Sequence, residues 1–468
     1  MMRLIGLVLR AAVLSIGLFG VVYAIALLAY RPLDTVEGEL LFEASRLRSG
    51  LSLWTHPQVG ANEYGAVPAR YYVLYTYIWP AIISLAPTKF AIGVGRAIAC
   101  LSYYGGLAWI VLRAPRERRL DVLVAAAFAG GVFMLVRAGV NGSADSLAVL
   151  LAAVALHRGV KKGELDAIAG ILFALAAWTK PNVIGVALGA ILFTILTKRL
   201  RAWPMLLGAL CVTLAMIGIE QFASRGLWIE HLLRSTGQAM NATVWAAHVV
   251  PRFMFLGLPH VGVIAYAWRA RRDRGVSVAL VSLATSLAWA LFSMAKIGSA
   301  THYWLEPSMA AVIVVATVPR QKSATSLPIA TTCLALLLAV LNARSIVLEL
   351  PRLRSTPSAL EHARKVCALG PTDVAIGEHP GIEMDLNQRI VATPFQLAHM
   401  QASDLEPWKH DIRKPEVRCL VMESDLLEQP LDRGDSAHDR FNVPMREALR
   451  TTFVLADQSG AFWTYRKR

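Results

Sequence analysis

The fold follows from the first fifty residues, where the apolar run LIGLVLRAAVLSIGLFGVVYAIALLAY (residues 4–30) leads directly into RPLDTVEGELLFEASRLRSG (residues 31–50). The first run exceeds the about 20 apolar residues that a helix needs to cross a bilayer. The second places three acidic residues, Asp34, Glu37 and Glu39, within six positions. A membrane exit that leads straight into carboxylates predicts a membrane protein with chemistry at one face of the bilayer.

The composition is that of a polytopic α-helical membrane protein. Of the 468 residues, 56% are hydrophobic and 17% are charged, and the mean hydropathy is +0.49. Soluble globular domains do not show this balance. Apolar runs of about 17 to 25 residues recur along most of the chain. The first run is too long for a signal peptide and no small-residue cleavage site follows it, so we expect it to remain as a span.

The net charge of +15 is concentrated in short loops. Nucleic-acid binding is therefore not expected, because the basic residues form the pattern of cytoplasmic loops. Sixteen basic residues fall in five loops, namely Arg113, Arg116, Arg118 and Arg119; Arg158, Lys161 and Lys162; Lys198, Arg199 and Arg201; Arg269, Arg271, Arg272 and Arg274; and Arg320 and Lys322.

The parity of the spans sets the topology. With the N-terminus inside, the first span exits near Tyr30, and the basic loop at 113–119 is inside again. One span therefore separates them, and the short stretch 71–86, with four tyrosines and Pro80, is expected to be an interfacial helix. Further spans are predicted at roughly 91–112, 120–136, 144–157, 165–179, 182–197, 203–220, 246–268, 276–295, 304–319 and 325–346, which gives about eleven transmembrane helices.

The C-terminal tail marks a break in composition. We expect residues 1–349 to form a transmembrane domain with a first outer loop at 31–90, and residues 350–468 to form a small soluble α/β domain on the outer side. Strand-like runs in the tail are TDVAIG, RIVA, RCLVME and FVLA. Cys367 and Cys419 could pair if the tail lies outside, and the five cysteines of the chain match no metal spacing.

The outer face gathers charged residues of both signs at the ends of predicted spans. Because charges facing lipid are costly, these residues are expected to line a cavity. The acidic candidates are Asp34, Glu37, Glu39, Asp145 and Glu306, and the basic candidates are Arg70, Arg137, Lys180 and Lys296. Carboxylates beside fixed cations suit a substrate that is anionic and also carries a proton.

Four short motifs lie at these positions. Glu37-Gly38 opens a long first outer loop, Arg137 and Asp145 lie at a span end in VRAGVNGSADSLAVLLAAVAL, and Lys180 ends a span in WTKPN. The loop GSATHYWLEP has His302 where Asn is common. Together with the tail segment GEHPGIEMDLNQRIVATPFQL, they resemble the GT-C superfamily of polyprenyl-phosphate-sugar glycosyltransferases, which includes protein mannosyltransferases and the aminoarabinose transferase of lipid A.

The resemblance implies a multi-pass enzyme of the bacterial inner membrane with its active site on the extracytoplasmic side. It would move a hexose or pentose from a polyprenyl-phosphate carrier to a glycan, lipid or protein acceptor. Departure of the polyprenyl phosphate leaves negative charge that nearby cations stabilise. The expected substrate-binding residues are Lys180, Arg137, Lys296, Arg70, His302, Tyr303 and Glu306.

The acceptor must lose a proton as it attacks the anomeric carbon. We expect Glu37 to be the general base and Asp34 to orient the start of its helix, with Asp34 or Asp145 as the next candidate for the base. A single base without a covalent intermediate gives inversion, by analogy with inverting glycosidases. Gly38 would leave room for a sugar beside the backbone.

Each candidate also has a purely structural interpretation. Asp34 and Glu37 fit a capping box for a helix that starts at Thr35, and Asp145 fits a helix N-cap. Lys180 fits an interface anchor, and Glu306 a carboxylate at a helix start. Glu39 and Glu43 fit a solvated helix face. No cofactor is assigned; a divalent metal held by Asp34, His56 and Glu63 is left open, because their spacing is no recognised ligand pattern.

Two other classes of protein would use the same charges. A transporter or flippase for a lipid-linked or anionic substrate would use them as an ion pathway. The clustering of the charges at one face and the lack of internal repeats disfavour it. A non-catalytic scaffold would use the tail to bind a partner. Release of free polyprenyl phosphate from a polyprenyl-phosphate sugar separates the enzyme from both.

The topology makes a direct prediction. Single cysteines placed in the loop 31–66 and in the tail after residue 350 should react with a membrane-impermeant thiol reagent added from outside, and cysteines at 114–119 and 270–274 should not. Labelling of the 114–119 loop from outside would mean that 71–86 crosses the bilayer and that the predicted topology is wrong.

Overall fold

The computed structural model describes residues 2–56, 58–73, 76–198, 202–236, 240, 242–296, 301–319, 329–398, 405–425, 427–429, 441–460 and 462–468. The chain divides into two compact units. The first, here called the helical unit, comprises Met1–Ala29, Gly95–Ile217 and Met240–Leu350. The second, here called the loop–tail unit, comprises Tyr30–Val94, Gly218–Ala239 and Pro351–Arg468.

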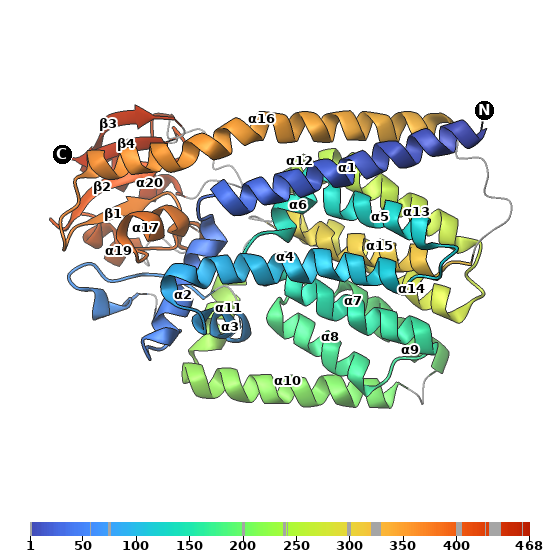
Figure 1. Ribbon diagram of the computed structural model, residues 1–468. Helices are drawn as coiled ribbons and strands as arrows, with labels where there is room; N and C mark the ends of the chain where they lie inside the picture. The colour runs from blue at the N-terminus through green and yellow to red at the C-terminus, as the bar shows by residue number, and fades with distance from the viewer. Residues whose placement is uncertain are drawn as a thin grey trace. The chain divides into compact units, whose positions relative to one another are not determined.

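Helices make up most of the chain (Figure 1). The first half contains α1 (Met2–Tyr30), α2 (Thr35–Arg48), η1 (Asn62–Tyr64), α3 (Ile78–Ser84), α4 (Thr88–Arg113), α5 (Arg119–Gly131), α6 (Phe133–Gly139), α7 (Asp145–Lys162), α8 (Ala167–Thr179), α9 (Gly185–Lys198) and α10 (Trp203–Ser224). The helices that follow are α11 (Leu227–Thr236), α12 (Ala242–Arg252), η3 (Phe253–Gly257), α13 (Leu258–Trp268), α14 (Arg274–Ser293), η4 (Thr301–Trp304), α15 (Leu305–Thr317) and α16 (Ile329–Cys367).

The chain is a polytopic helical membrane protein. Within the described residues, five helices are long and apolar enough to cross a bilayer: Gly6–Tyr30, Thr88–Arg113, Trp203–Ser224, Val249–Trp268 and Arg274–Ser293. The pair α5 and α6 would be a sixth span if it counts as one, although it bends by 76°. Helices α8 and α9 are apolar but shorter. The predicted total of about eleven stays a proposal, and the predicted span 325–346 begins among residues outside the described ranges.

At the bend between α5 and α6, a side chain of α16 forms hydrogen bonds with the backbone groups that the bend leaves unpaired. Breaking a helix frees backbone groups that no water can satisfy inside an apolar unit. Asn342 on α16 accepts a hydrogen bond from the backbone N–H of Phe133 at 2.6 Å and donates one to the carbonyl of Gly131 at 3.0 Å. The bend is therefore a built feature of the helical unit, since both freed groups have a partner.

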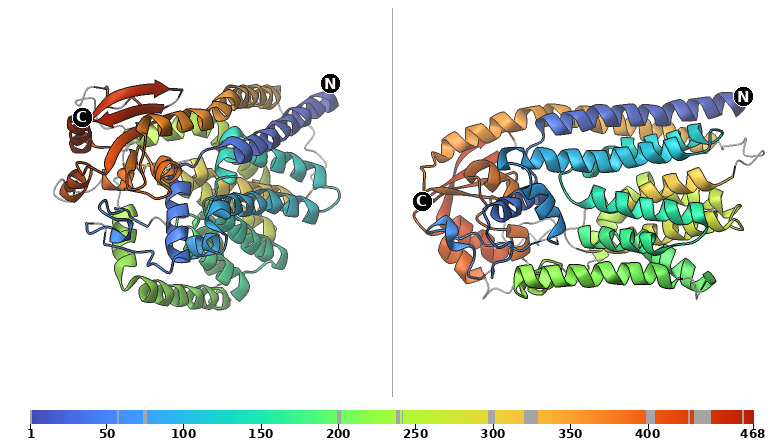
Figure 2. Two further views of the ribbon diagram at one scale, coloured as in Figure 1. Left: turned by 60° about the vertical axis from the view of Figure 1, so that its left-hand side comes forward. Right: turned by 60° about the horizontal axis from the view of Figure 1, so that its bottom comes forward.

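Glycines let the helices of this unit approach at backbone distance, as membrane helices commonly do. A Cβ added to Gly170 on α8 would lie 1.9 Å from the carbonyl oxygen of Met205 on α10. A Cβ on Gly189 of α9 would lie 2.7 Å from the Cα of Ser282 on α14. Figure 2 shows α9, α14, α15 and α7 packed as a bundle within this unit.

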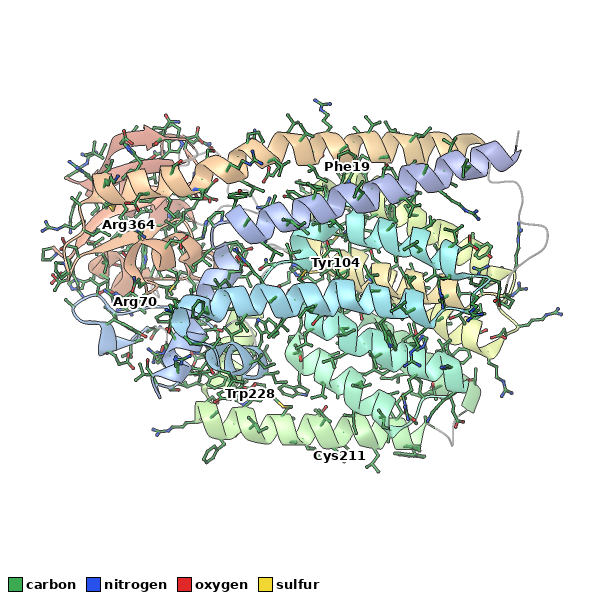
Figure 3. All side chains as sticks on the ribbon, viewed as in Figure 1. Phe19, Arg70, Tyr104, Cys211, Trp228 and Arg364 are labelled. Carbon is green, nitrogen blue, oxygen red and sulfur yellow. A yellow bond between two sulfur atoms is a disulfide. The ribbon has the colours of Figure 1, made fainter. Side chains whose placement is uncertain are left out.

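Apolar side chains on the outside of the helices mark the lipid-facing surface. Leu18, Leu101 and Leu214 are 67%, 72% and 59% exposed on α1, α4 and α10. Figure 3 shows Phe19 and Cys211, both exposed, among such outward side chains. Tyr104, by contrast, donates its hydroxyl to the carbonyl of Gly130 at 3.1 Å. Exposed apolar area repeated on long helices is characteristic of a membrane protein.

The loop–tail unit contains a four-stranded sheet in the order β1-β2-β4-β3 (Figure 1). Its strands are β1 (Val374–Gly377), β2 (Val417–Met422), β3 (Phe453–Ser459) and β4 (Phe462–Lys467), and the tail helices are α17 (Pro380–Asn387), α18 (Pro394–Leu397), α19 (Glu406–Asp411) and α20 (Val443–Thr452). Strands β1 and β2 are parallel, and β4 is antiparallel to both β2 and β3.

Both faces of the sheet are covered by apolar side chains. Ile376, Leu420 and Met422 face a cluster that includes Trp408 of α19 and Leu449 of α20. Alternate residues point the other way, so Ala375 and Val421 pack with residues of α16 and α17. Cys367 and Cys419 form a disulfide that joins the end of α16 to β2.

The strand predictions for the tail are partly right. The run TDVAIG contains β1, RCLVME contains β2 except its first residue, and FVLA is the start of β3. RIVA is not a strand, because its backbone N–H groups at Val391 and Ala392 donate to the Glu383 carboxylate. Strand β4 was not predicted, since FWTYRK carries charge at its end.

The stretch 71–86 is not a continuous helix. Among the described residues of this stretch, Ile78–Ser84 is the helical part, and Tyr71, Tyr72 and Val73 are buried outside any helix. The Tyr71 hydroxyl donates to the carbonyl of Leu53 at 2.5 Å, and the backbone N–H of Val73 donates to His231 at 2.9 Å. These hydrogen bonds join residues far apart in the sequence, and they hold the segment in place although its aromatic and apolar residues predicted an interfacial helix.

The glycine contacts predict the outcome of a matched pair of substitutions. Gly170→Ala should lower the unfolding temperature in detergent, because the new Cβ meets the Met205 carbonyl and overpacking costs about 1–3 kcal/mol. Gly105→Ala, in α4, has no atom within 4 Å of its new Cβ and should be neutral or stabilising by about 0.5–1 kcal/mol. Equal effects of the two substitutions would contradict the close packing of α8 on α10.

Candidate functional site

A buried group of charged side chains lies at the ends of three helices in the helical unit. Asp145 begins α7, Lys180 follows the end of α8, and His302 lies in η4 just before α15. The Lys180 Nζ is 3.4 Å from one Asp145 oxygen, and the His302 Nε2 is 3.9 Å from the other. The Asp145 and Lys180 side chains are 4% and 6% exposed. Their opposite charges offset the cost of burial that each would carry alone.

The structure excludes two of the structural interpretations at this group. Asp145 is not an N-cap, because Ala144 occupies that position and makes no side-chain cap. Instead the Ser143 hydroxyl donates to Asp145 at 2.7 Å. Lys180 is buried against Asp145 and is not an anchor that extends to the interface. Ser143 was not among the predicted residues, although it lies two positions from Asp145.

The turn that carries Lys180 is held from two sides. Pro181 disfavours helix at the preceding residue, so α8 ends at Thr179. The Asn182 side chain donates to the Tyr303 hydroxyl at 2.9 Å, and the Asn182 carbonyl accepts from the Trp289 indole at 2.9 Å. Tyr303 thus has a defined structural partner, and Lys180 projects from a fixed backbone.

A second lysine adds to the positive charge. Burial and the charge of Lys180 together lower the pKa of Lys296 to about 8. Asp145 offsets one of these two lysine charges, so the group of Asp145, Lys180 and Lys296 has a net positive charge near neutral pH. Lysine ammoniums held in this way suit a phosphate, which they bind as point charges.

Two other predicted residues of the helical unit have separate partners. Glu306 accepts hydrogen bonds from the backbone N–H groups of Gly185 and Val186 at 3.2 and 2.9 Å. It therefore caps the start of α9 as well as lying in the first turn of its own helix, α15. Arg137 lies 3.6 Å from Glu349, with its side chain 51% exposed.

The carboxylates of the opening sequence form a capping box in the loop–tail unit. The Asp34 side chain accepts from the backbone N–H of Glu37 at 2.8 Å, and the Glu37 side chain reaches back to the N–H of Asp34 at 3.4 Å. Arg31 pairs with Asp34. The predicted capping box and the start of the helix at Thr35 are confirmed, and the Glu37 side chain is fully buried.

Two expectations about this helix are wrong. Glu39 and Glu43 are 2% and 1% exposed, so they do not form a solvated face. Gly38 does not leave space beside the backbone, because a Cβ there would lie 2.3 Å from the backbone nitrogen of Gly381. Tertiary contacts from the tail reach Gly38 and Glu39, and no local pattern in α2 reveals them.

Arg70 and Glu63 each form an ion pair with a residue of another segment. The Arg70 Nε donates to Asp411 at 2.5 Å and its guanidinium also donates to the carbonyl of Gln58. Glu63 lies 3.1 Å from the buried guanidinium of Arg46, whose hydrogen bonds to the Glu63 carboxylate lower the pKa of that group. Among the described residues, no three His, Cys, Asp or Glu side chains are grouped to hold a metal ion. The proposed metal ligands are thus not brought together.

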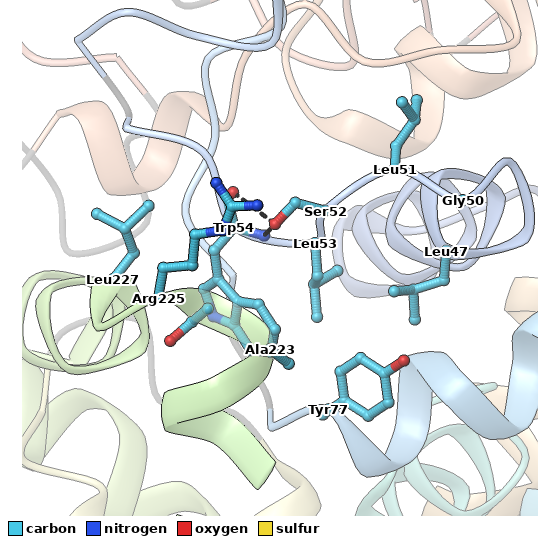
Figure 4. A pocket seen from close by; sticks show the side chains of 11 residues that line it. Leu47, Gly50, Leu51, Ser52, Leu53, Trp54, Tyr77, Ala223, Arg225 and Leu227 are labelled. Carbon is cyan, nitrogen blue, oxygen red and sulfur yellow. Dashed lines mark hydrogen bonds between the residues drawn. The ribbon is translucent and has the colours of Figure 1, made fainter. Parts of the chain in front are cut away.

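A cavity of about 560 Å³ opens beside the end of α2 in the loop–tail unit (Figure 4). Its lining is mainly aliphatic and aromatic, with the Trp54 and Tyr77 rings stacked 6.0 Å apart. Arg225 and Ser52 add polar groups, and the Ser52 hydroxyl donates to the Trp54 carbonyl at 3.0 Å. Such a cavity suits an amphiphile with an apolar body and an anionic group.

Comparison with solved structures finds the same fold in ArnT from Cupriavidus metallidurans bound to undecaprenyl phosphate. The match has a TM-score of 0.54 and 12% sequence identity, and it covers 97% of this chain and 97% of that chain. No family model and no curated protein matches the sequence. The predicted resemblance to the GT-C group is therefore confirmed at the level of the fold.

The Asp145–Lys180 pair predicts a pattern of stability changes. Asp145→Asn or Lys180→Met alone removes the charge that pairs with the other buried side chain at 3.4 Å and should cost about 3–5 kcal/mol. The double variant should cost less than the sum, because neither charge is then left behind. Thermal unfolding of the purified protein measures this, with Glu361→Gln in the exposed pair with Arg364 as a control worth about 0–1 kcal/mol. Additive losses in the double variant would contradict the pairing.

Proposed function

We propose that the protein is a glycosyltransferase of the GT-C type that moves a sugar from a polyprenyl-phosphate carrier to an acceptor on the outer face of the bacterial inner membrane. One observation carries the proposal: the fold matches, over 97% of both chains, that of a protein solved with undecaprenyl phosphate. The two neighbouring lysines Lys180 and Lys296, the first of them paired with Asp145, support it. The Cys367–Cys419 disulfide supports an extracytoplasmic tail, because disulfides persist in oxidising compartments.

The proposed reaction is a single displacement. An acceptor hydroxyl or amine attacks the anomeric carbon, its proton passes to the Glu37 carboxylate, and the bond between that carbon and the phosphate oxygen breaks. The polyprenyl phosphate leaves with the bonding electrons. Attack from the face opposite the leaving group inverts the configuration at the anomeric carbon.

The cations have the task of stabilising the phosphate as its charge grows. Lys180 and Lys296 bind the phosphate oxygens, and His302 lies beside the same carboxylate. Because Asp145 pairs with Lys180, its proposed role is to hold the ammonium in place, which makes it a positioning residue. Preorganised charges of this kind lower the barrier most in a site from which water is excluded.

Asp34 and Glu37, at the start of α2, have different proposed roles. Asp34 caps the helix and binds Arg31, so the first turn has a fixed geometry. Glu37 is the proposed general base. A carboxylate that is buried and held by a capping box keeps its orientation, which general-base catalysis requires.

The test is a purified-protein assay with a panel of undecaprenyl-phosphate sugars and acceptor lipids, in which free undecaprenyl phosphate is quantified. Glu37→Gln should reduce transfer by about 10² to 10⁴ while retaining the fold, because Gln also serves in a capping box. Asp34→Asn should be milder, since Asn caps well. Lys180→Ala should weaken use of the donor more than Lys180→Arg, which keeps the charge.

Glu117→Gln is the matched control, because Glu117 is exposed in a basic loop, and it should transfer as wild type does. Wild-type transfer by Glu37→Gln would remove Glu37 as the base and leave Asp34 or Asp145 as the next candidate. Movement of the lipid-linked sugar across a vesicle membrane without release of undecaprenyl phosphate would instead identify a transporter or flippase.

A further inference from the structure

The backbone of α2 touches the backbone of the tail next to Glu37. A Cβ added to Gly38 would lie 2.3 Å from the nitrogen and 2.6 Å from the Cα of Gly381 on α17. A Cβ added to Gly381 would lie 2.3 Å from the carbonyl oxygen of Leu33 and 2.6 Å from that of Asp34. Neither side of the contact can therefore accept a side chain, and two backbones fix the distance between α2 and α17.

A second contact holds the residue that follows. The Gln396 side-chain amide donates to the Glu39 carboxylate at 3.2 Å, and both residues are buried, at 4% and 2% exposure. A hydrogen bond to a buried charged group contributes more than one between neutral groups. Glu37 is thus held by the capping box, and the two residues after it are each held by the tail.

The two tail contacts share one anchor, the carboxylate of Glu383. One of its oxygens accepts the N–H of Gly377 at 3.0 Å, and the other accepts the N–H groups of Val391 and Ala392 at 2.5 and 3.0 Å. Glu383 lies in α17, two residues after Gly381, and the segment 391–392 leads into the helix that carries Gln396. The anchor therefore sets the spacing between the two contacts.

The same segment is joined to the first outer loop. The backbone N–H of Arg70 donates to the carbonyl of Val391 at 2.8 Å, and that of Thr393 donates to the carbonyl of Arg70 at 3.0 Å. His379 caps α17 by accepting the N–H of Gly381 at 3.1 Å. The tail contacts thus belong to one hydrogen-bonded frame, because each segment is tied to the next.

We infer that the tail acts as a clamp on α2, in which Gly381 and Gln396 are positioning residues that set the place of Glu37. The inference rests on the proposed function, since it gives the tail a task in that reaction. A misplacement of a catalytic group by about 1 Å can cost about 100-fold in rate. Loosening the clamp should therefore lower the rate of transfer while leaving binding of the donor nearly unchanged.

The test combines kinetics with hydrogen–deuterium exchange of the full-length protein. Gly381→Ala should lower kcat about 10- to 100-fold with the KM for the undecaprenyl-phosphate sugar within about twofold, and it should raise amide exchange in residues 35–48. Gln396→Met removes one hydrogen bond without a clash, so it should fold and show the same pattern more weakly. Gly93→Ala, where a Cβ meets no atom within 4 Å, is the control and should match wild type.

Exchanging the amide and the carboxylate between positions 396 and 39 should restore the rate of transfer. Gln396→Glu alone would oppose two carboxylates and should lower kcat, whereas Gln396→Glu combined with Glu39→Gln rebuilds a bond between an amide and a carboxylate and should restore kcat. Wild-type kcat in Gly381→Ala and Gln396→Met would overturn the clamp, as would a fall in kcat without any change in exchange of residues 35–48. If wild type releases no undecaprenyl phosphate, the proposed function fails, and the exchange data alone decide whether the tail holds α2.

Discussion

The cost of charge inside an apolar bundle governs where the ionisable side chains of the helical unit lie. Asp145 and Lys180 are buried together because either alone would lose its hydration without compensation. Glu306 meets the same cost by accepting two backbone N–H groups at the start of α9. Arg118 donates to the Tyr266 hydroxyl at 3.0 Å and to the carbonyl of Val315 at 2.9 Å. Each charge therefore links two or more elements, and the positions of the helix ends follow from these links.

Close contact between backbones at glycines also fixes the positions of helices, and it occurs in both units. In the helical unit Gly170 and Gly189 let α8 and α9 approach their neighbours. In the loop–tail unit Gly38 and Gly381 do the same for α2 and α17. The chemistry differs, since lipid-embedded helices associate through packing, whereas the contact at Gly38 lies beside carboxylates. In both cases the absence of a side chain gives a distance that flexible side chains could not hold.

Local signals in the sequence predicted local structure well. Asp34 and Glu37 three positions apart gave the capping box, and the apolar runs gave most of the helices. The Asn342 hydrogen bonds to the bend and the Gln396 bond to Glu39 join residues 209 and 357 positions apart, and no periodicity reveals such partners. Glu39 and Gly38 were misread for the same reason, because the tail residues that contact them lie far along the chain. The pairing of Lys180 with Asp145 was missed although both residues were singled out, since sequence places residues at span ends but does not say which ends meet.

The loop–tail unit is built from three segments that lie far apart in the sequence, and this has a consequence for biosynthesis. Arg70 and Asp411, which pair across 341 positions, cannot meet until the last part of the chain has been made. Contacts of such long range form late, because the entropy of loop closure opposes them. The disulfide between Cys367 and Cys419, which closes a segment of 52 positions, forms later still if it depends on the oxidising side of the membrane. The nascent protein would therefore have its first helices made while the Glu37 segment is still unsupported, and it would mature only when its C-terminal residues had been made and had folded onto that segment.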